Sequence, residues 1–355
     1  MKKNNKILAL LALALPSLTS CINEDLSGCG TDFGLTYNVR LRTNLRSTLY
    51  GELSAPAEQA MAERLATALG GVFTDRASDL DLAFYNGEAP AHREAHEMDG
   101  SSASYTIYLP SADYNHLAMA NAAAEPLVSV EGDAYSLLEF RQADADTLPS
   151  HTVGVFAARR QLRVADAGGS FNVDLYMQNS AVALVIDLNG HQLTDIHGSL
   201  SGMASAFAVA DSAYLFDRST VIRASRLDDG AGRVALYAAC FPSREASLQL
   251  SPVGRGLQAI QQGRLLGGAA PSPRERAGGE ASGGEASLYQ FVVYTTENGS
   301  ITESTLSVSE PLPAGGLKVI KACIGDGGQV VTDAPEVGVS VKLDWKPGGS
   351  HDVEM

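Results

Sequence analysis

The side chains with the most distinctive chemistry in this sequence are the thiols of four cysteines, Cys21, Cys29, Cys240 and Cys323. A thiol can be acylated, oxidised to a disulfide or used as a metal ligand. A structural metal site needs closely spaced cysteine or histidine ligands, and the sequence has no CxxC motif and no Cys/His cluster. Acylation and disulfide formation therefore remain as the possible uses of these thiols, and the sequence around each cysteine indicates which one applies.

Cys21 ends a segment with the pattern of an export signal. Three lysines at positions 2, 3 and 6 precede an apolar run from Ile7 to Leu18, which is too short to span a bilayer as a stable helix. The following Thr19-Ser20-Cys21 resembles the lipobox of bacterial lipoproteins, which implies cleavage before Cys21 and acylation of its thiol and amino group. Two or more acyl chains anchor a protein stably, whereas one binds only marginally. An ordinary cleaved signal with an unrelated cysteine is the alternative.

Composition limits the partners of the remaining chain. Removing residues 1–20 leaves 335 of the 355 residues, enough for two domains, and moves the formal net charge from −15 to −18. So acidic a chain, without a Lys/Arg cluster paired to aromatics, argues against binding nucleic acid or anionic lipid surfaces. No other segment reaches eighteen apolar residues. We therefore expect acyl chains to supply the membrane affinity.

Outside the cytoplasm, Cys29, Cys240 and Cys323 can form at most one intramolecular disulfide. Three pairings are possible, and the sequence alone does not choose among them. We favour Cys240 with Cys323, because both fall in strands expected in the second half of the chain. Cys29, near the membrane tether, is the alternative partner.

Patterns that suggest catalysis or ligand binding fit poorly. His92 and His96 are four residues apart, but the zinc-protease motif needs Glu directly after the first histidine on a helix, and this segment reads as a polar loop. Residues 254–259 superficially follow a dinucleotide fingerprint without the required strand and helix. No Gly-x-Ser-x-Gly motif occurs. We expect no enzyme, no cofactor, no metal site and no small-molecule substrate.

Hydrophobic periodicity predicts an all-β protein. Short alternating runs, each bounded by turn residues, predict strands in the first half at 35–45, 80–84, 105–109, 117–119 and 128–130. One helix is expected at 54–69, because Pro56 suits a first turn, Met61, Leu65 and Leu69 share a face, and Gly70-Gly71 can end it. Short strands with one helical insertion favour β-sandwiches.

A polar, proline-terminated segment at 143–150 suggests a domain boundary, so we expect an N-terminal β-sandwich at 35–155 and a C-terminal one at 156–355. Strands are predicted in the second at 171–177, 182–188, 234–241, 247–250, 289–295, 305–308, 317–323 and 337–345. The last alternates most cleanly, with Val337, Val339 and Val341 on one face. A Gly/Ala/Ser-rich insertion at 254–287 has no period and is expected to be a loop.

Three separated stretches resemble the FimB-type fimbrium anchoring subunits of Bacteroidales, relatives of the fimbrillins. The first is a lipidated cysteine followed by Asp25-Leu26-Ser27-Gly28-Cys29 within a leader at 21–34. The second is the run Tyr105-Thr-Ile-Tyr-Leu-Pro110 before Tyr114. The third is residues 173–186 together with the ending from Asp344 to Met355. The acidic pair after Cys21 also resembles the surface-export signal of such lipoproteins. An arginine frequent in relatives is replaced here by Gln178 or Ser180, and the insertion after Gly254 departs from the pattern.

The resemblance implies two transthyretin-like β-sandwiches in tandem and an outer-membrane lipoprotein, exposed at the cell surface, that anchors a fimbrium and limits its length. Its partners would be fimbrillin subunits, bound by addition of an extended strand to an open sheet edge. A surface glycan-binding lipoprotein, or an accessory or tip adhesin of the same superfamily, is the alternative. Thr147 and Ser212 lie in three-residue motifs that resemble the O-glycosylation signal of exported Bacteroidales proteins.

Overall fold

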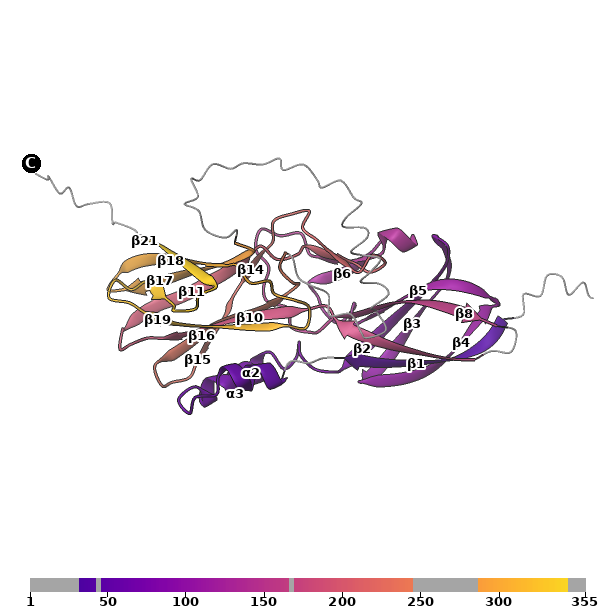
Figure 1. Cartoon of the computed structure of the whole chain (residues 1–355), viewed down its shortest axis with the longest axis horizontal. Coiled ribbons are helices and arrows are strands. Elements are labelled where there is room, and N and C mark those ends of the chain that lie inside the picture. Colours follow the sequence, from indigo (N-terminus) through magenta and orange to yellow (C-terminus); the bar gives the residue numbers. More distant parts are fainter. Residues whose placement is uncertain (1–31, 43–45, 166–168, 245–286, 344–355) are drawn as a thin grey trace, which may run out of the picture.

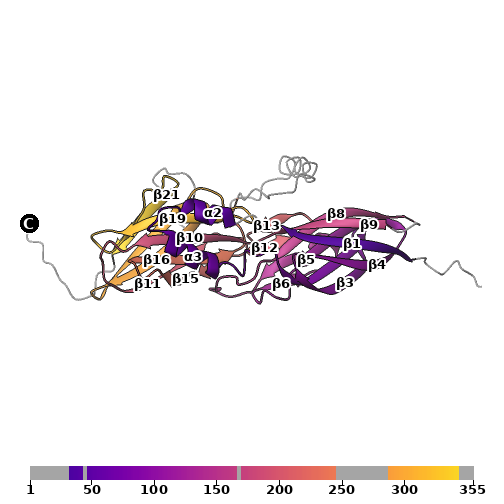
Figure 2. The ribbon, with the colours of Figure 1, turned by 90° about the horizontal axis from the view of Figure 1, so that it is seen from below.

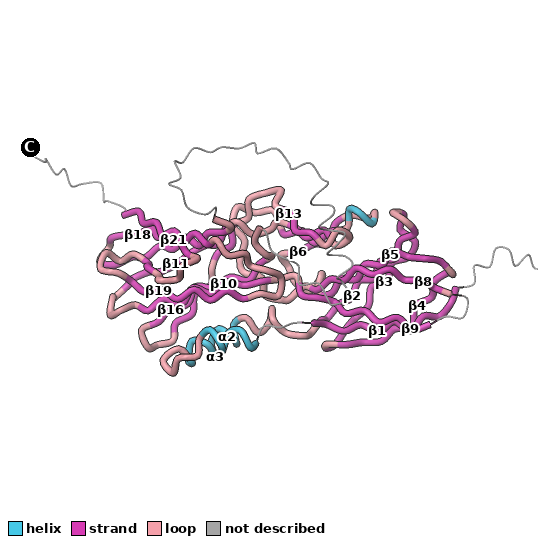
Figure 3. Tube along the Cα trace, viewed as in Figure 1, coloured by secondary structure: helices cyan, strands magenta, loops and turns pink. Residues whose placement is uncertain are grey.

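The structure is a computed structural model that describes residues 32–42, 46–165, 169–244 and 287–343. It is mostly β, with several sheets that form two β-rich bodies arranged along one long axis (Figure 1). Figure 3 shows that strands dominate both bodies and that helices α2 (Arg46–Glu52) and α3 (Gln59–Ala68) lie at one side of the second. Cys21, Cys29, Trp345, the strand expected at 247–250 and nearly all of the 254–287 insertion lie outside the described residues.

The first body is one seven-stranded sheet with the order β3-β2-β5-β8-β9-β1-β4. Its strands are β1 (Asp32–Arg42), β2 (Ala77–Asn86), β3 (Ala89–Gly100), β4 (Ser102–Pro110), β5 (Ala112–Ala120), β8 (Phe156–Val164) and β9 (Gly169–Met177). The two end strands approach each other, because the Tyr105 hydroxyl on β4 donates to the Glu97 carbonyl on β3 at 2.9 Å. The sheet therefore curls around its own core, which includes Tyr37, Phe84 and Leu175.

The second body packs two five-stranded sheets face to face, in the orders β15-β16-β10-β19-β20 and β14-β11-β17-β18-β21. Their strands are β10 (Ser180–Asp187), β11 (Leu193–Ser201), β14 (Val221–Arg223), β15 (Ser225–Asp228), β16 (Arg233–Cys240), β17 (Tyr289–Glu297), β18 (Ser300–Val308), β19 (Leu317–Ile324), β20 (Val330–Val331) and β21 (Val337–Leu343). Leu184, Leu236 and Phe291 lie in the core between them. This arrangement explains the clean alternation of the last predicted strand.

A small sheet joins the two halves of the sequence. Its order is β13-β12-β7-β6, with β6 (Val128–Glu131) and β7 (Glu139–Gln142) from the first half and β12 (Ala206–Ala208) and β13 (Ala213–Leu215) from the second. A short 3-10 helix, η3 (Tyr135–Leu137), connects β6 to β7. Because β7 pairs with β12, the connection between the bodies is hydrogen-bonded as well as covalent.

The division between the sheets does not fall where the sequence suggested. Strands β8 and β9 belong to the first body, so the change of sheet occurs between Met177 and Ser180 rather than after residue 155. The polar segment at 143–150 is the loop between β7 and β8. Turn-forming residues occur wherever the chain reverses, not only between domains. The turn at 143–150 leads into β8, which belongs to the first body.

The helical region also differs from its prediction. Two helices are present, α2 (Arg46–Glu52) and α3 (Gln59–Ala68), and both contact strands of the second body (Figure 2). Met61 and Leu65 on α3 are fully buried in one cluster with Ala183 on β10 and Ala235 on β16. Small side chains on that face of the sheet let the helices approach closely. The helix expected in the first domain therefore covers the second, and β10 is buried on both faces. No described helix is long and apolar enough to cross a bilayer.

Candidate functional site

Within the described residues, β21 is a seven-residue edge strand that no other element covers. In the first body the edge strands β3 and β4 meet near the turn that joins them, where the Tyr105 side chain bonds Glu97. In the second, β15 faces helix α3, β14 lies beside a bridge between Leu148 and Ile222, and β20 has only two residues. Strand β21 pairs with β18 on one side and ends its sheet on the other. Such an edge presents unpaired backbone N–H and C=O groups to a partner.

Three valines of β21 point toward the interior of the second body. Val337 pairs with Val308, Val339 with Leu306 and Val341 with Ser304, and residues directly opposite in a ladder share a face. All three partners on β18 are fully buried. The valines are progressively less covered along the strand, with exposed fractions of 8%, 36% and 41%. Cover from the opposite sheet thus stops at β18 and leaves an apolar strip along β21.

Hydrogen bonds fix the turn that provides this cover. Thr295 Oγ1 donates to the Gly328 carbonyl at 2.6 Å, Thr302 Oγ1 donates to the Gly327 carbonyl at 3.2 Å, and the Val330 amide donates to Ser304 Oγ at 2.9 Å. These bonds hold the turn between β19 and β20 over β17 and β18, beside the strip on β21.

The outer face of the same strand is polar. Lys342 Nζ donates to Glu303 Oε1 at 3.0 Å, and this bond lowers the pKa of the Glu303 carboxyl below its usual value. An exposed lysine on an edge strand is a common guard against pairing with unrelated strands. Strand β21 therefore combines an apolar inner face with a charged outer one, which favours a selective partner.

The preferred disulfide is wrong. Cys240 and Cys323 are both free, Cys240 buried and Cys323 half-buried. Cys240 pairs with Ser180 and Cys323 with Asp187, at opposite ends of β10. Seven residues of strand separate those positions, about 23 Å, whereas a disulfide needs Cα atoms within about 7 Å. Burial raises the pKa of the Cys240 thiol to about 12, so this thiol is inert.

The two predicted glycosylation residues differ in access. Thr147 is exposed in the loop between β7 and β8. Ser212 is 8% exposed in a tight turn, with φ of 52°. A folded chain can offer Thr147 to a transferase but not Ser212. Glycosylation at Thr147 stays a prediction.

The two histidines spaced like part of a zinc motif lie on strand β3 rather than in a loop. His92 Nε2 and His96 Nε2 are 2.5 Å and 2.8 Å from different oxygens of Glu94. The three side chains share one face because they alternate along the strand. No group of three or more His, Cys, Asp or Glu side chains in the described ranges has the geometry of a metal site.

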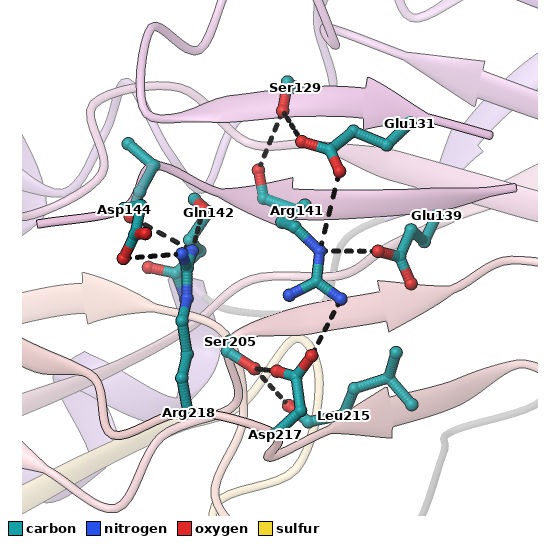
Figure 4. A network of polar contacts seen from close by, with 11 residues as sticks. Ser129, Glu131, Glu139, Arg141, Gln142, Asp144, Ser205, Leu215, Asp217 and Arg218 are labelled. Carbon is teal, nitrogen blue, oxygen red and sulfur yellow. Dashed lines mark hydrogen bonds and ion pairs between the residues drawn. The ribbon is translucent and has the colours of Figure 1, made fainter.

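An arginine network joins the halves of the small sheet and has no counterpart in the sequence predictions (Figure 4). Arg141 on β7 pairs with Glu139 at 2.5 Å and with Asp217, beyond β13, at 2.9 Å. Hydrogen bonds from Arg141 and Ser205 lower the pKa of the Asp217 carboxyl. Arg218 in turn pairs with Asp144 at 3.0 Å. Alternation within four-residue strands is too short to reveal such partners, and the network ties residues from the two halves of the sequence together at the small sheet.

A second polar junction is fully buried. The Asn179 Oδ1 accepts from the Val155 amide at 2.6 Å, and its Nδ2 donates to His151 Nδ1 at 2.8 Å. Burial lowers the pKa of the His151 imidazole to about 4. Glu125 accepts from the Thr152 and Val153 amides at 2.7 Å and 2.8 Å. These bonds fix the crossing between the bodies at residues 151–155 and 178–180.

Comparisons with known proteins give structural likeness at low sequence identity. No protein-family model and no curated protein sequence matches the chain. The structure is similar to that of a candidate adhesin from Bacteroides ovatus, with 10% identity over 90% of this chain and 99% of that one and a TM-score of 0.49. A fimbrial assembly protein from Parabacteroides distasonis matches at 10% identity over 88% and 99%, with a TM-score of 0.40. The fimbrial anchor protein Mfa2 from Porphyromonas gingivalis matches at 10% identity over 59% and 73%, with a TM-score of 0.39.

Proposed function

We propose that the protein is an outer-membrane lipoprotein that anchors a fimbrium, holding the membrane through acyl chains on Cys21 and the fimbrium through strand addition to β21. The observation that carries the proposal is the uncovered edge of β21 with its partly exposed apolar strip. An added strand would pair with the free backbone groups and cover Val339 and Val341. In this account the two bodies correspond to the transthyretin-like sandwiches that the sequence resemblance implies.

The shape of the molecule supports a connecting role. Strand β1 begins at the outer end of the first body, and β21 lies near the far end of the second (Figures 1 and 2). Asp32 is eleven residues from Cys21 in the sequence. A lipid at Cys21 would therefore hold the first body at the membrane and leave β21 directed away from it. The buried Asn179 and the Arg141 network would carry force between the two ends.

A charge placed on the apolar strip tests strand addition. Val341→Asp should reduce the amount of fimbrial subunit that copurifies with the protein at least about tenfold, because covering an unpaired carboxylate with an apolar strand costs about 2 kcal/mol or more. Ile301→Asp is the matched control, because Ile301 on β18 is 45% exposed on the opposite face of the same sheet. Equal copurification with both variants would contradict the proposal.

The membrane attachment has its own test. Cys21→Ala should leave the fold intact and release fimbriae into the medium, while Cys29→Ala, eight residues further on in the same leader, should keep them on the cell. Electron microscopy of the cells and immunoblots of the medium measure both. Wild-type amounts of cell-bound fimbriae in the Cys21→Ala strain would show that lipid at this residue does not anchor them.

A further inference from the structure

The outer face of strands β1, β4 and β9 carries a cavity of about 670 Å³. Its lining includes the side chains of Asn38, Arg40, Arg42, Arg160, Asn172 and Asp174. A volume in this range is typical of sites that hold small ligands or parts of larger ones. The cavity belongs to the first body, away from β21, so it has no part in the strand addition proposed above.

The cavity opens where two strands separate. Strands β8 and β9 pair only at Phe156 with Met177 and at Ala157 with Tyr176. Continued pairing would bring Arg160 opposite Val173, but the ladder has ended there, and both residues line the cavity. The gap lets the Arg160 side chain, which comes from the inner side of β8, reach a cavity on the outer face. Interrupted pairing thus adds a third guanidinium to the two supplied by β1.

The charge of this cavity is opposite to that of the chain. Its lining holds three arginines and one carboxylate, in a protein with a net charge of −15. Arg42 Nε lies 3.3 Å from Asp174 Oδ1 and offsets that carboxylate. Arg40 is exposed, and within the described residues neither it nor Arg160 has a carboxylate partner. Two guanidinium groups are therefore available to an anionic ligand, and guanidinium binds carboxylate and sulfate groups in a planar, paired geometry.

Amide groups beside the arginines are held in fixed orientations. Asn38 Nδ2 donates to Asn172 Oδ1 at 2.9 Å and to Ser170 Oγ at 3.2 Å. These bonds leave one acceptor, Asn38 Oδ1, and one donor, Asn172 Nδ2, for a ligand. An adjacent donor and acceptor of fixed direction suit the hydroxyl groups of a sugar, each of which both donates and accepts.

The same face carries an exposed aromatic ring. Ser102, Ser104, Thr106 and Tyr108 alternate along β4 on the outer side, and Tyr108 is 59% exposed. Its neighbour across the ladder is Gly34, where an added Cβ would lie 3.5 Å from Tyr108 Cε1. The missing side chain leaves room for the ring beside β1. Tyr108 and Ser102 are six residues apart, about 20 Å, so the ring and the cavity can contact one extended chain of several sugars.

We propose that this face binds an acidic polysaccharide. The free arginines take its carboxylate or sulfate groups, Asn38 and Asn172 bond its hydroxyls, and Tyr108 stacks on the apolar face of a sugar ring. An extended acidic polysaccharide would contact the arginines, the Asn38 and Asn172 amides and the Tyr108 ring together, and these groups lie on neighbouring strands of one sheet. The inference does not depend on the fimbrial function, because it concerns a different body and a different chemistry.

Isothermal titration of the protein with polygalacturonate, heparin and neutral dextran tests the inference. We expect binding of one or both acidic polymers, no binding of dextran, and weaker binding as salt rises. Arg40→Ala should weaken binding at least about tenfold, since a hydrogen bond to a charged group contributes about 1.5–3 kcal/mol. Tyr108→Ala should weaken it by about fivefold, and Tyr108→Phe should retain it because the ring is kept. Arg223→Ala and Tyr50→Ala, which remove exposed side chains on β14 and on α2, both at the second body, should change nothing.

Three results would overturn the inference. One is the absence of binding to both acidic polymers. Another is an equal loss in the Arg223→Ala control, which would assign the binding to overall charge. The third is binding of polyglutamate as tight as that of polygalacturonate and unaffected by Tyr108→Ala, which would identify the face as a site for acidic peptides.

Discussion

The two bodies of this protein treat the edges of their sheets in opposite ways. In the first body the end strands β3 and β4 approach, and the Tyr105 hydroxyl bonds the Glu97 carbonyl while its ring stacks on His96 at 4.3 Å. In the second body β21 ends its sheet, with Val339 and Val341 partly uncovered. The first body thus ties its two edges together near the turn that joins β3 to β4, through the Tyr105 side chain, whereas β21 has no such contact within the described residues.

The difference extends to the use of helices. Helices α2 and α3 lie between β1 and β2 in the sequence, yet they cover the second body beside β15. They protect one edge and one face of that body and leave β21 untouched. The described chain therefore covers the second body selectively, and the uncovered strand is the one to which we assign the partner.

The largest expected difference between the two regions is in stability. Phe84 lies fully buried in the first body, and Phe84→Ala should lower the free energy of unfolding by about 3–5 kcal/mol. Val341→Ala should cost less than about 1 kcal/mol, because much of its side chain already contacts water. Urea denaturation of both variants measures this. Similar losses would mean that β21 is part of the closed core, against the comparison.

A smaller effect is expected from acid. His116 is fully buried in the first body, where its Nδ1 donates to the Ala83 carbonyl at 3.0 Å and its Nε2 accepts from the Tyr37 hydroxyl at 2.7 Å. Burial lowers the pKa of its imidazole to about 3. The unfolded imidazole binds a proton near pH 6.5, so between pH 6.5 and 3 the unfolded state holds one proton more.

Stability should therefore fall as pH decreases through that window, by about 3 kcal/mol at pH 4 from this group. Above pH 6.5 the group contributes no pH dependence. His116→Gln should flatten the slope between pH 6.5 and 4, whatever its effect at neutral pH. Denaturation midpoints measured at each pH provide the check, and an unchanged slope would show that other groups, such as His151, dominate the acid response.

The smallest effect concerns the contact that brings the closed edges together. Tyr105→Phe removes the hydroxyl that bonds Glu97 and keeps the ring on His96, so it should cost about 1 kcal/mol. Hydrogen exchange of β3 and β4 amides should become faster while β21 stays unchanged. Faster exchange of β21 as well would mean that the two edges are coupled.

Strands buried on one face were predictable from the sequence because their alternation is visible without knowledge of the partner. Residues 35–45 and 337–345 correspond to β1 and β21 within a few residues. Strand β3 was not predicted, since its residues from Ala89 to Gly100 show no alternation of apolar and polar side chains and become a strand only by pairing with β2. The packing of α3 on the second body depends on contacts far apart in the sequence, which periodicity does not report.

The candidate site was predictable only in part. Alternation placed Val339 and Val341 on one face of a strand, but their exposure depends on where the opposite sheet ends, and that is a property of β20 and its turn. The pairing of Cys240 with Cys323 failed for a related reason. Both lie on neighbours of β10, yet their positions along it were set by register, which the sequence did not reveal.

Hydrogen exchange of the β21 amides, measured in the protein alone and mixed with purified fimbrial subunits, tests the central claim most directly. Amides on the free edge of β21 should exchange quickly in the protein alone and at least about tenfold more slowly in the mixture, because an added strand would pair with them. The amides of β3 and β4 should not change. Unchanged exchange along β21, with new protection elsewhere on the second body, would contradict the assignment of this edge as the attachment site.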